Sequence, residues 1–437
     1  MMHAHLRSAI IAFVLASVPV SSAQQSPDPA VVLQHAGHRL LADLDRMPRY
    51  TCVQTITRKY YEAASRIQHP SCGALIVAHQ KRKHELDALG WDRMRLEVAL
   101  VDGTSVYSWV GAPRFDDATL EKLAGRGPLG SGDFGVFLSE VLRWATLQFQ
   151  QEVVVDGRRL YQYSYSIPVE TSRYQVKTSD GWAATAYSGT VLLDPADEDI
   201  ARLTVNTPEL AAHSAGCQVS SEVDYGRTPI HDRMILVPRV TRLRSIERAG
   251  NETASLTTFT GCREYSSTVR MLLDSPSIDG PPGPVLSTLT EQPEPLPAGL
   301  HFSWRLVTPI DSDTAAGGDL VEAVLRQPIR NSKGRVVAPA GARLHGRVRS
   351  FEQRSDPRSG QDSFVIGLQF ESVEIAGRKV PFTATSFSDL PPTLARRRAA
   401  EDPQDVGILL FEQEHLHLKQ ADAEWITTSV DTGKDKK

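Results

Sequence analysis

Seven prolines fall between residues 275 and 298 of this 437-residue chain. Proline lacks a backbone N–H and fixes φ, so neither a helix nor a sheet continues through such a window. We therefore predict a stiff extended linker at residues 275–298. It would separate a larger domain at residues 24–274 from a smaller one at residues 299–427, and residues 428–437 would form a disordered tail.

The first 23 residues have the three parts of an export signal. Arg7 closes a short polar start, an apolar run follows at residues 9–16, and residues 18–23 end in a small-x-small pattern. Signal peptidase reads that pattern, and the apolar run is too short to span a bilayer. We expect cleavage after Ala23 and a periplasmic or secreted protein without a lipid anchor, because no Cys follows the cleavage site.

Charge and hydropathy exclude two classes of partner. The chain has 48 Lys and Arg against 52 Asp and Glu, a net charge of −4. A nucleic-acid binder needs a basic face, so nucleic acid is not an expected partner. After the signal, no stretch is long and apolar enough to cross a bilayer, so the mature chain is expected to have no integral membrane segment.

The remaining chain has four cysteines, Cys52, Cys72, Cys217 and Cys262. An even count in an exported protein predicts two disulfides, and three pairings are possible. We favour Cys52–Cys72 and Cys217–Cys262, because each pair is near in sequence and joins segments that resemble neighbouring strands. The spacings do not fit a redox or zinc site, so no metal or cofactor is expected.

The pattern along residues 24–274 is mainly that of strands with a few helices, an α+β arrangement. Asp28 and Pro29 predict the start of a helix that ends near Met47-Pro48. From Tyr50 onwards, apolar residues recur at every second position, which is typical of strands. Hairpins are expected at residues 102–103, 156–157 and 249–251. One helix interrupts the strands, with Phe134, Phe137, Leu138, Val141 and Leu142 on its buried side.

Residues 299–427 have the pattern of a second β-rich block. Its predicted strands are residues 302–306, 319–325, 342–352, 363–373, 380–384, 406–411 and 415–418.

Three short motifs have competing interpretations. Gly125, Gly127 and Gly130 match a dinucleotide loop, but the βαβ unit that such a loop needs is missing, so a flexible approach to the Phe134 helix is favoured. The Asp-Thr-Gly triplet at residues 431–433 occurs once in a charged tail, whereas an aspartic protease needs two carboxylates in one site. His415 and His417 share a strand face without a third ligand, which favours a partly exposed strand over a metal site.

An aromatic cluster supplies the candidate ligand-binding residues. Tyr161, Tyr163 and Tyr165 share one strand face, and Trp109 is expected nearby. Together with Phe134 and Phe137 of the interrupting helix, they would line an apolar cavity that the helix covers. The alternative is that all six side chains are simply core.

Residues 30–270 resemble a family of uncharacterised exported bacterial proteins. The resemblance rests on the segments YTCVQTI (50–56), DRMRLEV (92–98), YSW (107–109), TAYSGT (185–190) and TFTGCREY (258–265). The element order also resembles the lipoprotein-carrier (LolA/LolB-like) fold. That resemblance implies an unclosed antiparallel barrel with helices that fill its mouth.

The C-terminal block resembles the outer β-domain of TrbI-type type IV secretion channel proteins. The matching segments are LVTPIDS (306–312), GD (318–319) and APAGARLHGRV (338–348), within residues 303–384 and a possible continuation at residues 407–427. The chain lacks the helical antenna with which the channel proteins would pierce the outer membrane. A role in channel formation is therefore not expected, although the block could dock on envelope components.

We expect a non-enzymatic cell-envelope protein whose N-terminal domain binds a lipid, an acyl chain or a hydrophobic polypeptide segment. A lipid or lipoprotein and an envelope protein complex are the expected partners. One alternative is an envelope scaffold, or a secretion-associated structural protein, without a small ligand. The other is a hydrolase of unknown class, for which a cluster of Asp, Glu and His in a cleft would be the sign.

Overall fold

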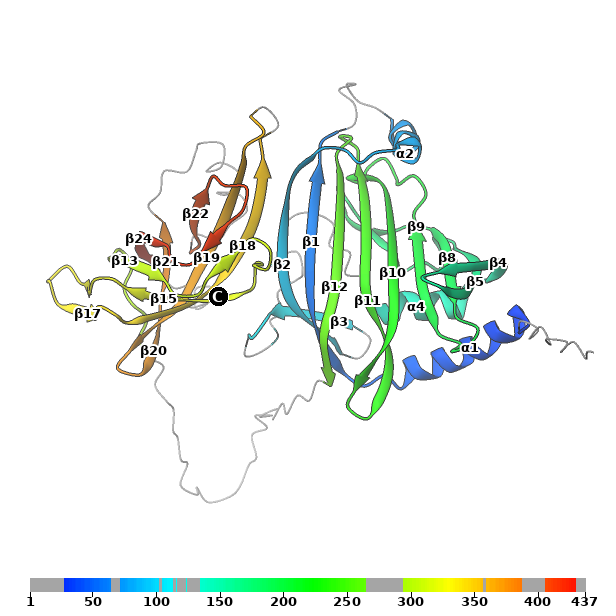
Figure 1. Ribbon diagram of the computed structural model, residues 1–437, viewed down its shortest axis with the longest axis horizontal. Coiled ribbons are helices and arrows are strands. Elements are labelled where there is room, and N and C mark those ends of the chain that lie inside the picture. The colour runs from blue at the N-terminus through cyan, green and yellow to red at the C-terminus, as the bar shows by residue number, and fades with distance from the viewer. Residues whose placement is uncertain are drawn as a thin grey trace, which may run out of the picture.

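The structure is a computed structural model that describes residues 27–63, 71–101, 104–112, 115, 123, 134–264, 294–356, 359–386 and 405–429 (Figure 1). Strands dominate it, as predicted, and the larger half is built on an antiparallel sheet with helices packed against it. The predicted fold class is therefore confirmed. The predicted signal peptide and most of the predicted linker and tail lie outside the described residues. Thr428, the first residue of the predicted tail, belongs to a strand.

The sheet of the N-terminal half runs from an edge at β4 to an edge at β3, and every neighbouring pair in it is antiparallel. Among the described residues, β4 pairs only with β5, so this sheet does not close into a barrel. Its strands in spatial order are β4 (Gln148–Val155), β5 (Arg158–Ile167), β8 (Tyr187–Leu193), β9 (Ile200–Asn206), β10 (Gly216–Ile230), β11 (Arg233–Glu247), β12 (Glu252–Glu264), β1 (Tyr50–Tyr61), β2 (Ala88–Val101) and β3 (Thr104–Trp109). A separate hairpin consists of β6 (Gln175–Thr178) and β7 (Gly181–Ala184).

Local sequence explains these strands. In β2, Met94, Leu96 and Val98 are buried and alternate with partly exposed residues, as the period of two predicts. The hairpin of β4 and β5 turns at Asp156 and Gly157, which both have positive φ values, 50° and 77°. That conformation is the one a two-residue hairpin loop needs, and an Asp-Gly pair adopts it readily.

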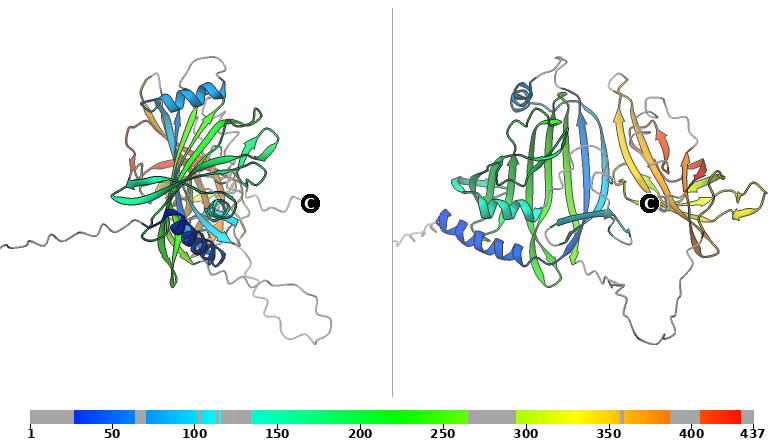
Figure 2. Two further views of the ribbon diagram at one scale, coloured as in Figure 1. Left: turned by 90° about the vertical axis from the view of Figure 1, so that its right-hand side faces the viewer. Right: turned by 180° about the vertical axis from the view of Figure 1, so that it is seen from behind.

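Within the described residues, three helices accompany the sheet. In α1 (Pro29–Asp45), the Asp28 side chain accepts a hydrogen bond from the Ala30 N–H, which confirms the predicted start. In α4 (Phe134–Trp144), Leu138 and Val141 are buried. The two helices contact each other and lie together across the strands β5, β8 and β9 (Figure 2). The third helix, α2 (Cys72–Lys81), packs at one end of the sheet against β10.

The C-terminal half surrounds its own core, in which Trp304, Trp425 and Phe370 are almost fully buried. The strand β13 pairs with β15 and β24, and β18 pairs with β15 and β19. The strands are β13 (His301–Leu306), β14 (Ile310–Asp311), β15 (Leu320–Leu325), β16 (Ile329–Arg330), β17 (Val336–Ala338), β18 (Arg343–Ser355), β19 (Asp362–Ile375), β20 (Arg378–Pro381), β21 (Thr383–Ser386), β22 (Gly407–Phe411), β23 (His417–Leu418) and β24 (Asp422–Thr428).

The two halves share one continuous sheet. The end of β18 pairs with the start of β2, with Glu352 opposite Asp92 and Arg354 opposite Gly90. Next along β2, Gly317 forms backbone hydrogen bonds with two residues of that strand. Its N–H donates to the Arg93 carbonyl (2.8 Å), and its carbonyl accepts from the Arg95 N–H (2.6 Å). The strand β3 completes the same edge. Three separate segments thus cover the edge of β2. The sequence predicted β3, through the hairpin at residues 102–103, but not β18 or Gly317.

The favoured disulfide pairing is wrong. Cys52 is bonded to Cys262, and Cys72 is bonded to Cys217. Cys52 cannot face Cys72 on a neighbouring strand, because Cys72 begins the helix α2. Cys52 instead lies in β1, whose neighbour β12 carries Cys262.

Candidate functional site

One face of the N-terminal sheet carries most of the candidate residues. We call it the inner face and define it by Tyr161 and Tyr163 at one end and by Tyr50 and Cys52 at the other. The strand register connects the two ends, because side chains directly opposite each other on neighbouring strands point to the same face. Tyr163 faces Val191, Val191 faces Leu203, and the same alternation continues through β10, β11 and β12 to β1.

The three predicted tyrosines lie together on the inner face beneath α1. Their exposed fractions are 1%, 1% and 5%, so they form part of a packed core. The Tyr161 hydroxyl donates to the Pro27 carbonyl at 2.6 Å, and the Tyr163 hydroxyl donates to the Pro29 carbonyl at 2.7 Å. The Tyr165 hydroxyl donates to the Thr204 carbonyl at 2.7 Å. Two of the three hydroxyls therefore hold the start of α1 against the sheet.

The helix α4 is fixed to the same end of the sheet. Phe137 packs against Tyr174 and Tyr187, with ring centroids 5.4 and 6.3 Å apart. The carboxylate of Glu140, which is 3% exposed, accepts hydrogen bonds from the Tyr187 hydroxyl (2.9 Å) and the Arg173 N–H (3.1 Å). Phe134 begins α4, but its side chain lies outside what the structure describes. A ligand would reach the tyrosines only if α1 or α4 moved away.

Trp109 is not part of the tyrosine cluster. It lies at the end of β3, opposite Leu96 of β2. The guanidinium carbons of Arg349 and Arg347, both from β18, are 4.7 and 5.9 Å from the centroid of its ring. Trp109 therefore contributes to the contact between the two halves, through cation–π attraction.

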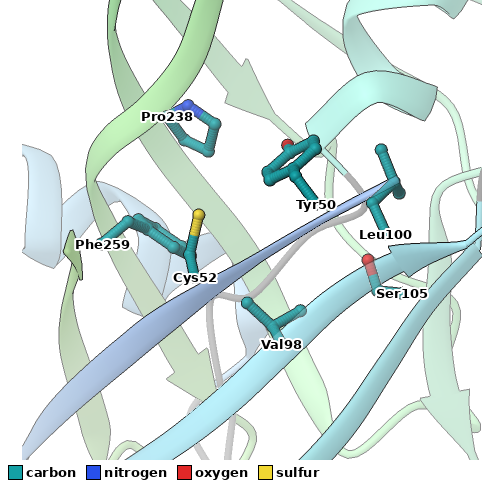
Figure 3. Close-up of a pocket in the computed structure, with 7 residues that line it drawn as sticks. All are labelled: Tyr50, Cys52, Val98, Leu100, Ser105, Pro238 and Phe259. Atoms are coloured by element: carbon teal, nitrogen blue, oxygen red, sulfur yellow. The ribbon is translucent and has the colours of Figure 1, made fainter. Parts of the chain in front are cut away.

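An apolar pocket lies at the other end of the inner face (Figure 3). Its cavity volume is about 20 Å³, and the pocket opens to solvent. That is about the space of one water molecule, so a longer apolar group would enter only if the surrounding side chains moved. Five neighbouring strands supply its walls, so residues far apart in sequence meet there. The lining residues are Tyr50, Cys52, Val98, Leu100, Ser105, Pro238 and Phe259.

The pocket lining carries no ionised side chain, and a disulfide connects two of the strands that form it. Burial raises the pKa of Tyr50 to about 12, so this phenol is neutral at physiological pH. The disulfide from Cys52 to Cys262 ties β1 to β12, the two strands that carry Tyr50 and Phe259. An apolar pocket whose only side-chain oxygens are the hydroxyls of Tyr50 and Ser105, with no ionised side chain in its lining, suits an apolar group rather than a charged one.

The other motifs do not add to this site. His417 is paired with Asp311, at 2.7 Å between Nδ1 and Oδ2, and His415 lies 3.3 Å from the Ser312 hydroxyl. In the part of the chain that the structure describes, no three His, Cys, Asp or Glu side chains are placed to hold a metal ion. The Gly125–Gly130 motif and the triplet at residues 431–433 lie outside that part. None of the described helices is long and apolar enough to cross a membrane.

Sequence reasoning missed the pocket. Leu100 and Ser105 belong to a predicted hairpin, but nothing in the local pattern connects them with Pro238 or Phe259. Only the pairing of β1 with both β2 and β12 brings these residues together. The one usable signal in the sequence was the alternation of side chains along a strand, which places Tyr50 and Cys52 on one face of β1.

No protein-family model and no curated protein matches this chain. Among solved structures, it is similar to a LolA superfamily protein from Nitrosomonas europaea, with 9% identity over 53% of this chain and 94% of that one, at a TM-score of 0.23. It is also similar to a DUF1329 family protein from Desulfovibrio piger, with 11% identity, coverages of 55% and 94% and a TM-score of 0.26. A third structure, from Vibrio parahaemolyticus, is described as an outer membrane lipoprotein-sorting protein domain. It has 9% identity, coverages of 52% and 93% and a TM-score of 0.23.

At these identities and TM-scores, the similarities carry no argument about ligand or activity. None of the three structures supports the resemblance of the C-terminal half to TrbI-type channel proteins, which stays a prediction. The function proposed below therefore rests on the geometry of the inner face.

Proposed function

We propose that this chain is a non-enzymatic cell-envelope protein that binds an acyl chain or another hydrophobic segment in the pocket of its inner face. The supporting observation is the pocket lined by Tyr50, Val98, Leu100 and Phe259, which offers apolar walls without an ionised group. Each methylene moved from water into such walls contributes about 0.8 kcal/mol. A lipid or a lipoprotein would bring the required chain.

Export to the envelope is part of the same proposal. The two disulfides support it, since disulfides persist in oxidising compartments outside the cytoplasm. The predicted signal sequence, with cleavage after Ala23, points to the same compartment.

The tyrosine end of the inner face would contact ligand only in an open state. We include Tyr161, Tyr163, Tyr165, Phe134 and Phe137 as ligand contacts in that state, after α1 or α4 has lifted. Lifting α1 would break the hydrogen bonds that the Tyr161 and Tyr163 hydroxyls donate to the Pro27 and Pro29 carbonyls. Trp109 would take part only at the border between the halves, where Arg347 and Arg349 already contact its ring.

Two observations favour a second candidate function, an envelope scaffold without a small ligand. The tyrosine cluster is densely packed, and the two halves share one sheet through β2 and β18. A chain built in this way could present its surface to an envelope protein complex and bind nothing inside.

Binding of an apolar fluorophore distinguishes the two candidates. The full chain, titrated with 1-aminoanthracene, is expected to bind it saturably, and dodecanol is expected to displace it. A linear, non-saturating signal that dodecanol does not change would contradict the binding proposal and leave the scaffold.

A further inference from the structure

The strand β4 is an exposed edge of the N-terminal sheet. Among the described residues it pairs only with β5, and it lies at the end of the sheet away from the C-terminal half (Figure 1). Its residues are exposed except for Val153 and Val155, which are half-buried. A bulge between Phe149 and Gln151 leaves residues 151–155 as its regular part. An edge strand directs a row of backbone N–H and C=O groups outward, so it can pair with another strand.

The sequence of β4 has few of the features that prevent such pairing. Native edge strands often carry Lys, Pro or several charges. In contrast, β4 has a single charged residue, Glu152, and ends in three consecutive valines. Val154 is 70% exposed, Phe149 is 43% exposed, and Trp144 just before the strand is 65% exposed. Exposed apolar side chains that gather beside an unpaired edge are typical of an interaction surface.

The register of the β4–β5 hairpin shows which backbone groups point outward. Val155 and Arg158 flank the two-residue turn, and a flanking pair of this kind exchanges backbone hydrogen bonds. Along an antiparallel pair, hydrogen-bonded and non-hydrogen-bonded positions alternate. Val154 and Glu152 therefore direct their N–H and C=O groups away from β5. A further strand at this edge would bond to these two residues.

We propose that β4 pairs antiparallel with β4 of a second copy of this chain, about a two-fold axis at Val153. In this register Glu152 of each copy lies opposite Val154 of the other, and the whole of residues 151–155 is paired. An axis at Glu152 would place two carboxylates directly opposite each other. An axis at Val154 would place Glu152 opposite Asp156 of the turn. Like charges directly opposite each other destabilise a sheet, so the axis at Val153 is favoured.

The charges beside this edge suit a second copy. Arg159 of β5 is exposed and lies directly opposite Val154. One row across the joined sheets would therefore hold Arg159 and Val154 of one copy, followed by Glu152 of the other. The arginine side chain is long enough to reach that carboxylate across the small valine, and the two-fold axis provides this contact twice. An unrelated partner would have to supply the acidic group itself, whereas a second copy brings it.

This pairing goes beyond the proposed function and does not depend on it. The edge β4 and the pocket lie at opposite ends of the inner face, since Tyr50 and Phe259 belong to β1 and β12. A dimer joined at β4 would leave both pockets accessible.

Sedimentation velocity of the full chain tests the association. Between about 1 and about 300 µM, the wild type is expected to shift from monomer to dimer, as a small interface allows only modest affinity. Val154→Glu places a carboxylate opposite Glu152 of the other copy, and should raise the dimer dissociation constant about ten-fold. Val154→Lys places a cation there, and should not raise it.

The matched control is Val336→Glu, because Val336 is an exposed valine on β17 in the C-terminal half. This variant is expected to associate as the wild type does. A wild type that stays monomeric at every concentration would overturn the proposal. So would a dimer that Val154→Glu leaves as tight as before.

Disulfide crosslinking tests the register. The two copies of Val153 would form a non-hydrogen-bonded pair with Cα atoms about 4.5 Å apart, within the range of a disulfide. Val155 points to the same face, but its two copies would be about 14 Å apart. Oxidation with copper phenanthroline is expected to link Val153→Cys into covalent dimers and to leave Val155→Cys as monomers on a non-reducing gel. Equal crosslinking of both variants, or of neither, would overturn the proposed pairing.

Discussion

Gly90 of β2 lies so close to β18 that a Cβ atom in its place would be 2.2 Å from the carbonyl oxygen of Gln353. Its φ of +147° is also in the region that favours glycine. This close approach is where the strand of one half pairs with the strand of the other. The absence of a side chain at residue 90 therefore permits the continuous sheet.

Gly90→Ala is expected to reduce the free energy of unfolding, because β2 and β18 must separate to admit the methyl group. We expect a loss of about 2–3 kcal/mol in urea unfolding. Gly377→Ala is the control, since its φ is +75° and nothing lies within 4 Å of the added atom. That control should lose about 1 kcal/mol from backbone strain alone. Equal losses in the two variants would contradict the close approach.

The contacts between the halves should survive a cut in the predicted linker. A specific protease site is placed at residues 281–284, and the nicked protein is expected to elute as one species in gel filtration. The reasons are the β2–β18 pairing, the hydrogen bonds of Gly317 and the ion pair of Arg95 with Asp319. Asp319→Ala should weaken this association. Two separate fragments from the nicked wild type, without denaturant, would show that the halves are independent.

The disulfides close long loops. The bonded cysteines are 210 and 145 residues apart, so each bond removes much chain entropy from the unfolded state. The chain-entropy treatment gives about 5 kcal/mol for a loop of this length. Cys72→Ala combined with Cys217→Ala should therefore lower the free energy of unfolding by up to that amount. Peptide mapping without reduction checks the pairing, and a peptide that joins Cys52 to Cys72 would refute it.

Alkaline pH should destabilise the protein through its buried tyrosines. Burial raises the pKa of Tyr50 and that of Tyr174 to about 12, from an ordinary value of 10. The folded state therefore holds these protons more tightly than the unfolded state. Their contribution is fully present below pH 10 and is lost as the pH rises from 10 to 12.

Unfolding free energies measured at several pH values test this direction. In the wild type the free energy of unfolding should fall between pH 10 and pH 12. Tyr50→Phe should reduce this fall by up to about 2–3 kcal/mol, the amount that a pKa shift of two units contributes. A decline of the same steepness in the wild type and in both Tyr50→Phe and Tyr174→Phe would mean that other groups cause it.

Local sequence predicted the individual strands and helices better than it predicted which of them pair with each other. The alternation in β2 and the Asp-Gly turn before β5 specify their strands without reference to the rest of the chain. The helix α2 was missed, although Ser71 caps it by accepting a hydrogen bond from Ala74 N–H. Its ten residues are too short to show a clear helical period.

Long-range contacts explain the errors at the site. The tyrosines were predicted to share a face and do so, but the hydroxyls of Tyr161 and Tyr163 bond to carbonyls at the start of α1, which is more than 130 residues earlier in the chain. Proximity in sequence likewise favoured the wrong disulfides. The pocket depends on the register of β1 with β2 and β12, and periodicity along one strand says nothing about register with another.

A variant that fills the pocket tests the central claim most directly. Ser105 lines the pocket, and Val106 is the next residue of β3, so its side chain points to the opposite face. The full chain with Ser105→Phe is expected to bind 1-aminoanthracene at least about ten-fold more weakly than the wild type, while Val106→Phe binds as the wild type does. Equal binding by all three proteins would show that the pocket is not the binding site.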